Sequence, residues 1–153
     1  MSKLDDRLAE LGLTVPTTSK PVAAYIPAVA SGNLVYTSGQ LPMVDGALPM
    51  TGKVGVEVDA DAAKQLARTC VLNGLAAARS AIGSLVRITR VVKVVGFVAS
   101  DPSFTGQPGV INGASELLAE IFGESGQHAR SAVGVAVLPL DAPVEVEFVF
   151  EFA

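Results

Sequence analysis

Two stretches near the end of the chain alternate between apolar and polar or small residues with a period of two. This period is typical of β-strands, whose successive side chains point to opposite faces. Residues 128–137 and 144–151 are therefore predicted to form two strands joined by a proline-bearing turn. The first strand places on one face Ser131, Val133, Val135 and Val137, and on the other Arg130, Ala132, Gly134 and Ala136. We expect the β-branched face to be the core face, and the small-residue face to be covered by a ligand, a second subunit, or both.

The second of these strands separates its side chains even more sharply. One face carries Val144, Val146, Phe148 and Phe150, and the other carries Glu145, Glu147 and Glu151. An arginine and a glutamate at the mouth of a small-residue face form a plausible pair for binding an acid and activating water. The sequence alone leaves two interpretations of Arg130 open: a clamp for a substrate carboxylate, or the structural salt-bridge partner of a glutamate.

The rest of the chain alternates between helical and extended patterns. Apolar residues at helical spacing predict helices over 59–82 and 110–122, with Asp59 as a cap and Pro108 in the approach to the second helix. Other patterns predict a short helix over 2–11, a linker over 13–21, a hairpin of 25–30 and 34–37, a loop with a short edge strand over 41–56, and a central strand over 88–100. These elements predict an α+β fold with two helices packed on one face of a mixed sheet of about six strands.

Composition excludes several classes of function. The chain has 153 residues, half of them apolar, and a net charge of −4. This charge argues against a nucleic-acid surface, and no apolar run is long enough to cross a membrane. The N-terminus has no apolar signal-peptide core, and a single cysteine fits a reducing compartment, so we expect a cytoplasmic protein. We expect this cysteine, Cys70, to be a small buried hydrophobe. The lone His128 lies in no pattern of metal ligands, so no metal site is predicted.

Several motifs together resemble one family. Arg130-Ser131, Leu138-Pro139 and the alternation over 144–147 are similar to the C-terminal signature of the RidA (YjgF-type) enamine/imine deaminases, formerly labelled endoribonuclease L-PSP. The segments 36–40, Tyr-Thr-Ser-Gly-Gln, and 97–104, which contains Phe97, Asp101 and Phe104, resemble the first hairpin and the central strand with its exit loop. The resemblance extends over residues 20–152. It implies one RidA-like domain over 1–153 with the chorismate-mutase-like fold, in which residues 1–19 form an N-terminal helical arm and linker. It also implies a homotrimer with clefts between subunits.

The resemblance also implies a reaction and a set of site residues. The reaction is hydrolysis of a 2-imino acid, or its enamine tautomer, to a 2-keto acid and ammonia, without a cofactor. Arg130 is expected to bind the substrate carboxylate and Glu145 to orient and deprotonate water. The residues expected to contact the substrate or water are Tyr25, Ser38, Gly39, Asn112 and Ala132. From the residues alone, Tyr25 is equally an ordinary strand aromatic and Asn112 equally a solvent-facing amide.

One departure from the family pattern concerns activity. Many members carry a cysteine two residues after the arginine, and Ala132 stands at that position here. A second hypothesis is therefore a non-catalytic trimer that binds or senses small carboxylates or amino acids, which would keep the role of Arg130 but not that of Glu145. A third, an endoribonuclease, has least support, because the chain is acidic, has one histidine and few aromatic residues for base stacking.

Overall fold

One five-stranded mixed sheet organises the fold. The computed structural model describes residues 2–18 and 24–153. The sheet has the strand order β1-β2-β5-β3-β4. Its strands are β1 (Ala28–Ser31), β2 (Leu34–Thr37), β3 (Ile88–Ala99), β4 (Ala129–Val135) and β5 (Val144–Phe152). All neighbours are antiparallel except β3 and β4, which are parallel and are connected through α3 (Gln107–Phe122), because a parallel pair needs a crossover connection.

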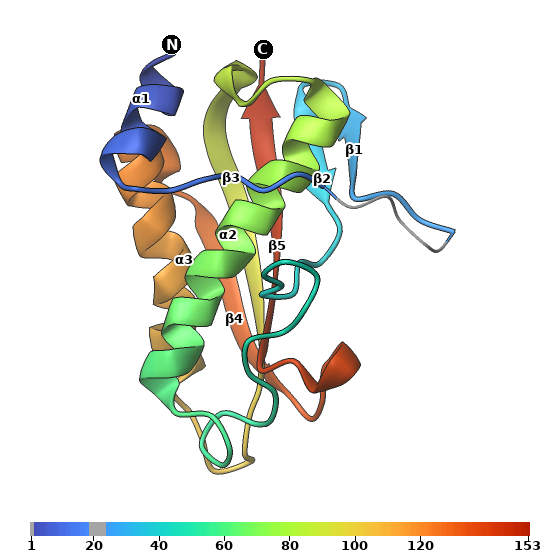
Figure 1. Cartoon of the computed structure of the whole chain (residues 1–153), viewed down its shortest axis with the longest axis vertical. Helices are drawn as coiled ribbons and strands as arrows, with labels where there is room; N and C mark the ends of the chain where they lie inside the picture. Colours follow the sequence, from blue (N-terminus) through green and yellow to red (C-terminus); the bar gives the residue numbers. More distant parts are fainter. Residues whose placement is uncertain (1, 19–23) are drawn as a thin grey trace.

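The two long helices lie on the same face of the sheet, as predicted. Figure 1 shows α2 (Ala60–Ile82) running across the strands with α3 beside it. The Asp59 side chain caps α2 by accepting a hydrogen bond from the Ala62 backbone, and Pro108 lies in the first turn of α3. The predicted N-terminal helix is α1 (Lys3–Glu10), which begins at a capping box on Ser2. Leu8 of α1 is buried in the same core, so the arm is packed onto the fold.

The core lies between this helical layer and the inner face of the sheet. Four apolar residues of β5 point into it and are buried: Val144, Val146, Phe148 and Phe150. The Phe148 ring lies against α2 at Gly74, where a Cβ atom would come within 2.4 Å of the ring. Because the helix has no side chain there, the ring packs directly on the helix backbone. A Phe148→Ala change would leave a large cavity and would cost about 3–5 kcal/mol of folding free energy.

One predicted strand does not form, and the predicted start of another strand was wrong. The loop over 41–56 holds isolated bridges but no strand, so the sheet has five strands rather than about six. Asp45 and Gly46 both adopt positive φ in a tight turn, which interrupts the extended backbone that an edge strand would need. The first hairpin strand begins at Ala28 rather than at Tyr25. The last three residues of the predicted linker, 19–21, lie outside the described residues.

The predicted core face of β4 was also wrong. Val133 lies on the uncovered face of the sheet and is 45% exposed, whereas Arg130 contacts α3 and Ala132 packs against the core. The small residues face the helical layer because α3 lies close over this strand. A Cβ atom added to Gly134 would be 2.8 Å from the Gln107 side chain at the start of α3.

Among the described residues no α-helix packs on the other face of the sheet, and a small apolar cluster around Ala99, Leu138 and Ala142 covers one end of it. This face exposes apolar side chains, including Val29, Tyr36 and Val133, beside Glu145 and Glu147. Apolar side chains exposed together on one face of a sheet favour association with another surface. In the described part of the chain, no helix has both the length and the apolar character required to cross a bilayer.

Candidate active site

Arg130 projects from the edge strand β4 and has no carboxylate partner in the described part of the chain. Its Nη1 donates to Asn112 Oδ1 at 2.7 Å and to Ser115 Oγ at 3.2 Å, and both acceptors are on α3. Among the described residues, neither Nη2 nor Nε donates to a protein acceptor. None of the salt bridges within the described residues includes Arg130. Arg130 is half-buried. Neutral groups hold its guanidinium through one nitrogen, and the other two nitrogens remain available to donate to an anion.

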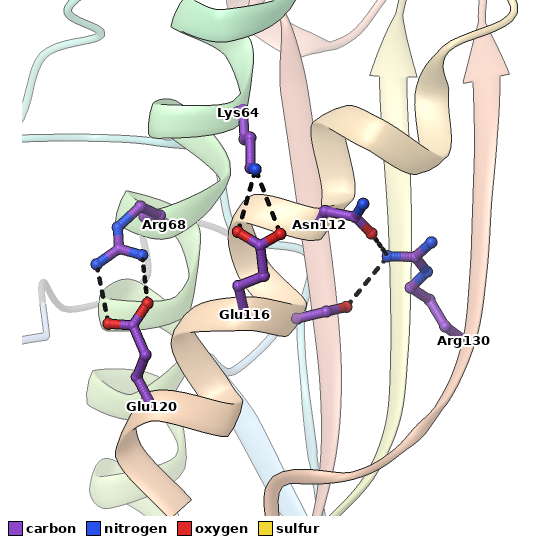
Figure 2. Close-up of polar contacts among 7 residues, drawn as sticks. Lys64, Arg68, Asn112, Glu116, Glu120 and Arg130 are labelled. Atoms are coloured by element: carbon purple, nitrogen blue, oxygen red, sulfur yellow. Dashed lines mark hydrogen bonds and ion pairs between the residues drawn. The ribbon is translucent and has the colours of Figure 1, made fainter. Parts of the chain in front are cut away.

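The glutamates of α3 are paired elsewhere. Figure 2 shows Glu116 and Glu120 turned toward α2, on the opposite side of α3 from Arg130. Glu116 pairs with Lys64 at 3.1 Å, and Glu120 pairs with Arg68 at 3.2 Å. These pairs join the two helices, and they leave the positive charge of Arg130 uncompensated. The structural salt-bridge interpretation of Arg130 is not supported in this chain.

Asn112 and Ala132 both lie close to Arg130. Asn112 uses its carbonyl oxygen to hold the guanidinium, so its amide nitrogen is the group left for a ligand. Ala132 is two residues along β4 from Arg130 and its side chain packs against the core. Because β4 is at the edge of the sheet, alternate backbone groups of this strand have no strand partner within one chain.

Glu145 lies at a different place, against the turn that follows β2. A Cβ atom at Gly39 would be 1.9 Å from Glu145 Oε1, so the carboxylate occupies the space that any other residue would fill. The antiparallel bridge between Gln40 and Val146 holds this turn beside β5. Partial burial raises the pKa of the Glu145 carboxyl, and the neighbouring charge of Glu147 raises the pKa further. A carboxyl group with a raised pKa is a better proton acceptor than an ordinary glutamate.

Tyr25, Ser38 and Gly39 line one cleft. The cleft has a volume of about 1080 Å³ and is bounded by the linker residues 14 and 16–18, the turn at 38–41 and α2 at Asn73. The Tyr25 side chain is 61% exposed. The Ser38 hydroxyl donates to the Ile26 carbonyl at 2.7 Å, so it offers a ligand its lone pairs rather than its hydrogen.

The candidate residues therefore form two groups that one chain does not bring together. The first group, on β4 and α3, is Arg130, Asn112 and Ala132. The second group, around the turn after β2, is Tyr25, Ser38, Gly39 and Glu145. In the sheet register Ala132 pairs with Gly96, which pairs with Val146, so the two strands are two spacings or roughly 10 Å apart. The expectation that Arg130 and Glu145 share one face was wrong, because their side chains leave opposite faces of the sheet.

Two residues near Arg130 were not predicted. Ser115 lies one helical turn after Asn112, and His128 lies two residues before Arg130 on the same side of the chain. Helical spacing of three and strand spacing of two were both visible in the sequence and would have placed them beside the arginine. Among residues 2–18 and 24–153, no cluster of three or more His, Cys, Asp or Glu side chains is arranged to hold a metal ion.

Comparison with known proteins identifies the family. A family model described as "YjgF/chorismate_mutase-like, putative endoribonuclease" matches residues 5–153. The chain belongs to the YjgF family. The match begins inside α1, so it includes most of the N-terminal helix.

Three YjgF-like relatives illustrate the range of names. Protein TCP17 of Trypanosoma cruzi is 44% identical over 145 residues, covering 94% of this chain and 91% of that protein. The crystal structure of Atu1372 from Agrobacterium tumefaciens, titled as having unknown function, is 48% identical with a TM-score of 0.90 and covers 98% of this chain and 93% of that one. The 2-iminobutanoate/2-iminopropanoate deaminase of Escherichia coli is 32% identical, covering 88% of this chain and 93% of that protein. Membership in the YjgF family confirms the resemblance seen in the sequence and makes an enzyme of this kind a family-level possibility.

Proposed function

We propose that this protein hydrolyses small 2-imino acids, or their enamine tautomers, to 2-keto acids and ammonia. The observation that carries the proposal is Arg130: a half-buried guanidinium that has, among residues 2–18 and 24–153, no carboxylate partner, and that keeps two nitrogens available. A half-buried cation without a counter-ion is costly, and a bound anion would offset that cost. The planar fork of an arginine suits a carboxylate, which can accept two parallel hydrogen bonds from it.

The site would be completed by a second copy of the chain. We infer a homotrimer in which the uncovered sheet face of each subunit is buried, so that the Glu145 group of one subunit lies opposite the Arg130 group of its neighbour. The exposed apolar side chains on that face support this arrangement, since they would otherwise remain in water. The clefts between subunits would then hold both groups of residues at one substrate.

Within such a cleft the chemistry would need no cofactor, because the imine carbon is already electrophilic. Arg130 would bind the carboxylate and fix the position of the neighbouring imine carbon. Glu145 would accept a proton from water as the water oxygen bonds to that carbon, and the C=N electron pair would move to nitrogen. The same carboxyl group would return that proton to the nitrogen, which gives a carbinolamine. It would then take the hydroxyl proton of the carbinolamine and pass it to the nitrogen as the C=O bond forms and the C–N bond breaks, releasing the keto acid and ammonia.

Relatives support this proposal without deciding it. The Escherichia coli relative is named a deaminase of this type, whereas the family description also contains the word endoribonuclease. A net charge of −4 opposes binding to a polyanion, so we place the ribonuclease last. The second candidate is a trimeric binder of small carboxylates, favoured by one observation: Ala132 offers no thiol where many members carry a cysteine.

A coupled assay separates these candidates. A dehydratase acting on serine or threonine would generate 2-iminopropionate or 2-iminobutyrate, and release of the keto acid would be followed with and without this protein. The proposal expects acceleration by the wild type, with little acceleration by Arg130→Ala or Glu145→Gln. If the wild type binds pyruvate but leaves the spontaneous rate unchanged, the protein is a binder rather than a deaminase.

A further inference from the structure

The imidazole of His128 is held at both of its nitrogens. Nδ1 is 2.6 Å from the Gly126 carbonyl oxygen, and Nε2 is 2.9 Å from Ser115 Oγ. A carbonyl oxygen can only accept, so Nδ1 carries the hydrogen and donates it. In a neutral imidazole Nε2 then has a free lone pair, and the Ser115 hydroxyl donates to it.

This arrangement fixes the orientation of the Ser115 hydroxyl. Because its hydrogen points to His128, its lone pairs are free to accept from Nη1 of Arg130, which is 3.2 Å away. The hydrogen bonds therefore run in one direction, from Arg130 to Ser115, from Ser115 to His128, and from His128 to Gly126. Nη1 of Arg130 also donates to Asn112, so both side chains that hold the guanidinium among the described residues are neutral.

We propose that Ser115 and His128 are positioning residues that hold Arg130 ready for the substrate carboxylate. The inference rests on the proposed function, because it assigns these contacts to the same arginine site. Together with Asn112, Ser115 occupies Nη1 and leaves Nη2 and Nε for the ligand. Neutral partners orient the guanidinium without neutralising its charge, which a carboxylate partner would do.

Orientation matters at this place in the fold. Arg130 is on an edge strand and half-buried, where a long side chain would otherwise sample many rotamers. Holding it in one rotamer before binding removes that entropy loss from the binding step. The effect acts through Arg130, so it should appear in carboxylate affinity rather than in the stability of the fold.

The single histidine in the sequence allows a direct spectroscopic test. A long-range ¹⁵N–¹H spectrum of the wild type needs no assignment, since it contains one imidazole. At pH 8, where a histidine side chain is ordinarily neutral, we expect a protonated Nδ1 and an unprotonated Nε2. A spectrum with the hydrogen on Nε2 would overturn the proposal whether or not the protein binds a carboxylate.

Affinity variants supply the functional test. Pyruvate would be titrated into the wild type, Ser115→Ala, His128→Gln, the double variant and Ser115→Thr, with melting temperatures measured in parallel. We expect each of the first two changes to weaken binding roughly fivefold, the usual size of one neutral hydrogen bond. The double variant should be no weaker than the weaker single variant, because His128 acts through Ser115. Ser115→Thr, which keeps the hydroxyl, should retain wild-type affinity.

The outcomes separate this proposal from the proposed function. If the wild type binds no keto acid, the proposed carboxylate site is refuted. The His128 tautomer then shows whether the contacts of His128 with Ser115 and Gly126 exist in solution. If the wild type binds and Ser115→Ala binds equally well, the site stands and the positioning role is overturned. Additive losses in the double variant, or a loss in Ser115→Thr equal to that in Ser115→Ala, would also overturn it.

Discussion

Replacement of Arg130 by alanine tests the carboxylate site most simply. The change removes the two guanidinium nitrogens that have no protein acceptor among the described residues, and with them a two-pronged, charge-assisted contact. Hydrogen bonds to charged groups contribute about 1.5–3 kcal/mol each, and a desolvated clamp contributes about 2–5 kcal/mol. Arg130 is half-buried, so we take the lower part of that range, about 2–3 kcal/mol. This is a loss of roughly 30- to 150-fold in affinity for a keto acid.

The assay is calorimetric or NMR-detected titration with pyruvate or 2-oxobutyrate. Arg130→Lys should recover little of the affinity, because an ammonium group cannot reproduce the fork. Arg90→Ala is the matched control, since Arg90 is an exposed arginine on the adjacent strand β3. Equal losses in Arg90→Ala and Arg130→Ala would mean that overall charge attracts the ligand. Unfolding or loss of assembly in Arg130→Ala would mean that the arginine is structural.

Three further changes test the Glu145 group and the core. Gly39→Ala should lower the rate of imine hydrolysis on the order of 10²-fold, because the new methyl group displaces the Glu145 carboxylate. Gly109→Ala is the control and should leave the rate unchanged, because a Cβ atom there meets nothing within 4 Å. Because the pKa of Glu145 is raised, we expect the rate of imine hydrolysis to fall on acidification at a higher pH than it would for an ordinary glutamate. Glu147→Gln removes the neighbouring charge, so it should move this fall to lower pH and leave the plateau rate near that of the wild type. A pH profile that does not move would mean that another group is the base. Burial, aided by the charge of Glu145, raises the pKa of the Cys70 thiol, so a thiol reagent should modify no cysteine in the native protein and one in denaturant.

Much of the fold follows from local patterns. The bounds of α2 were predictable because Asp59 supplies a cap and a helical apolar stripe follows it. The strand β3 was predictable from a long β-branched run with almost no polar break. These signals depend on near neighbours in the sequence, and the packed structure keeps them.

The covered face of β4 was not predictable in the same way. Alternation shows that Val133 and Ala132 are on opposite faces, but it does not show which face meets the helices. The close approach of α3 over the strand decides this, and that approach is a tertiary property. The separation of Arg130 from Glu145 has the same origin, because it depends on strand order and not on either strand alone.

We propose that one site takes Arg130 from one subunit and Glu145 from its neighbour. This proposal can be tested by co-expressing Arg130→Ala and Glu145→Gln chains with different affinity tags and purifying the mixed trimers through both tags. In a ring of three, every mixed trimer has one site that combines an intact Arg130 with an intact Glu145 from adjacent subunits. We predict that these mixed trimers hydrolyse the imine at about one third of the wild-type rate, although each parent variant is nearly inactive. Mixed trimers no more active than the parent variants would contradict it.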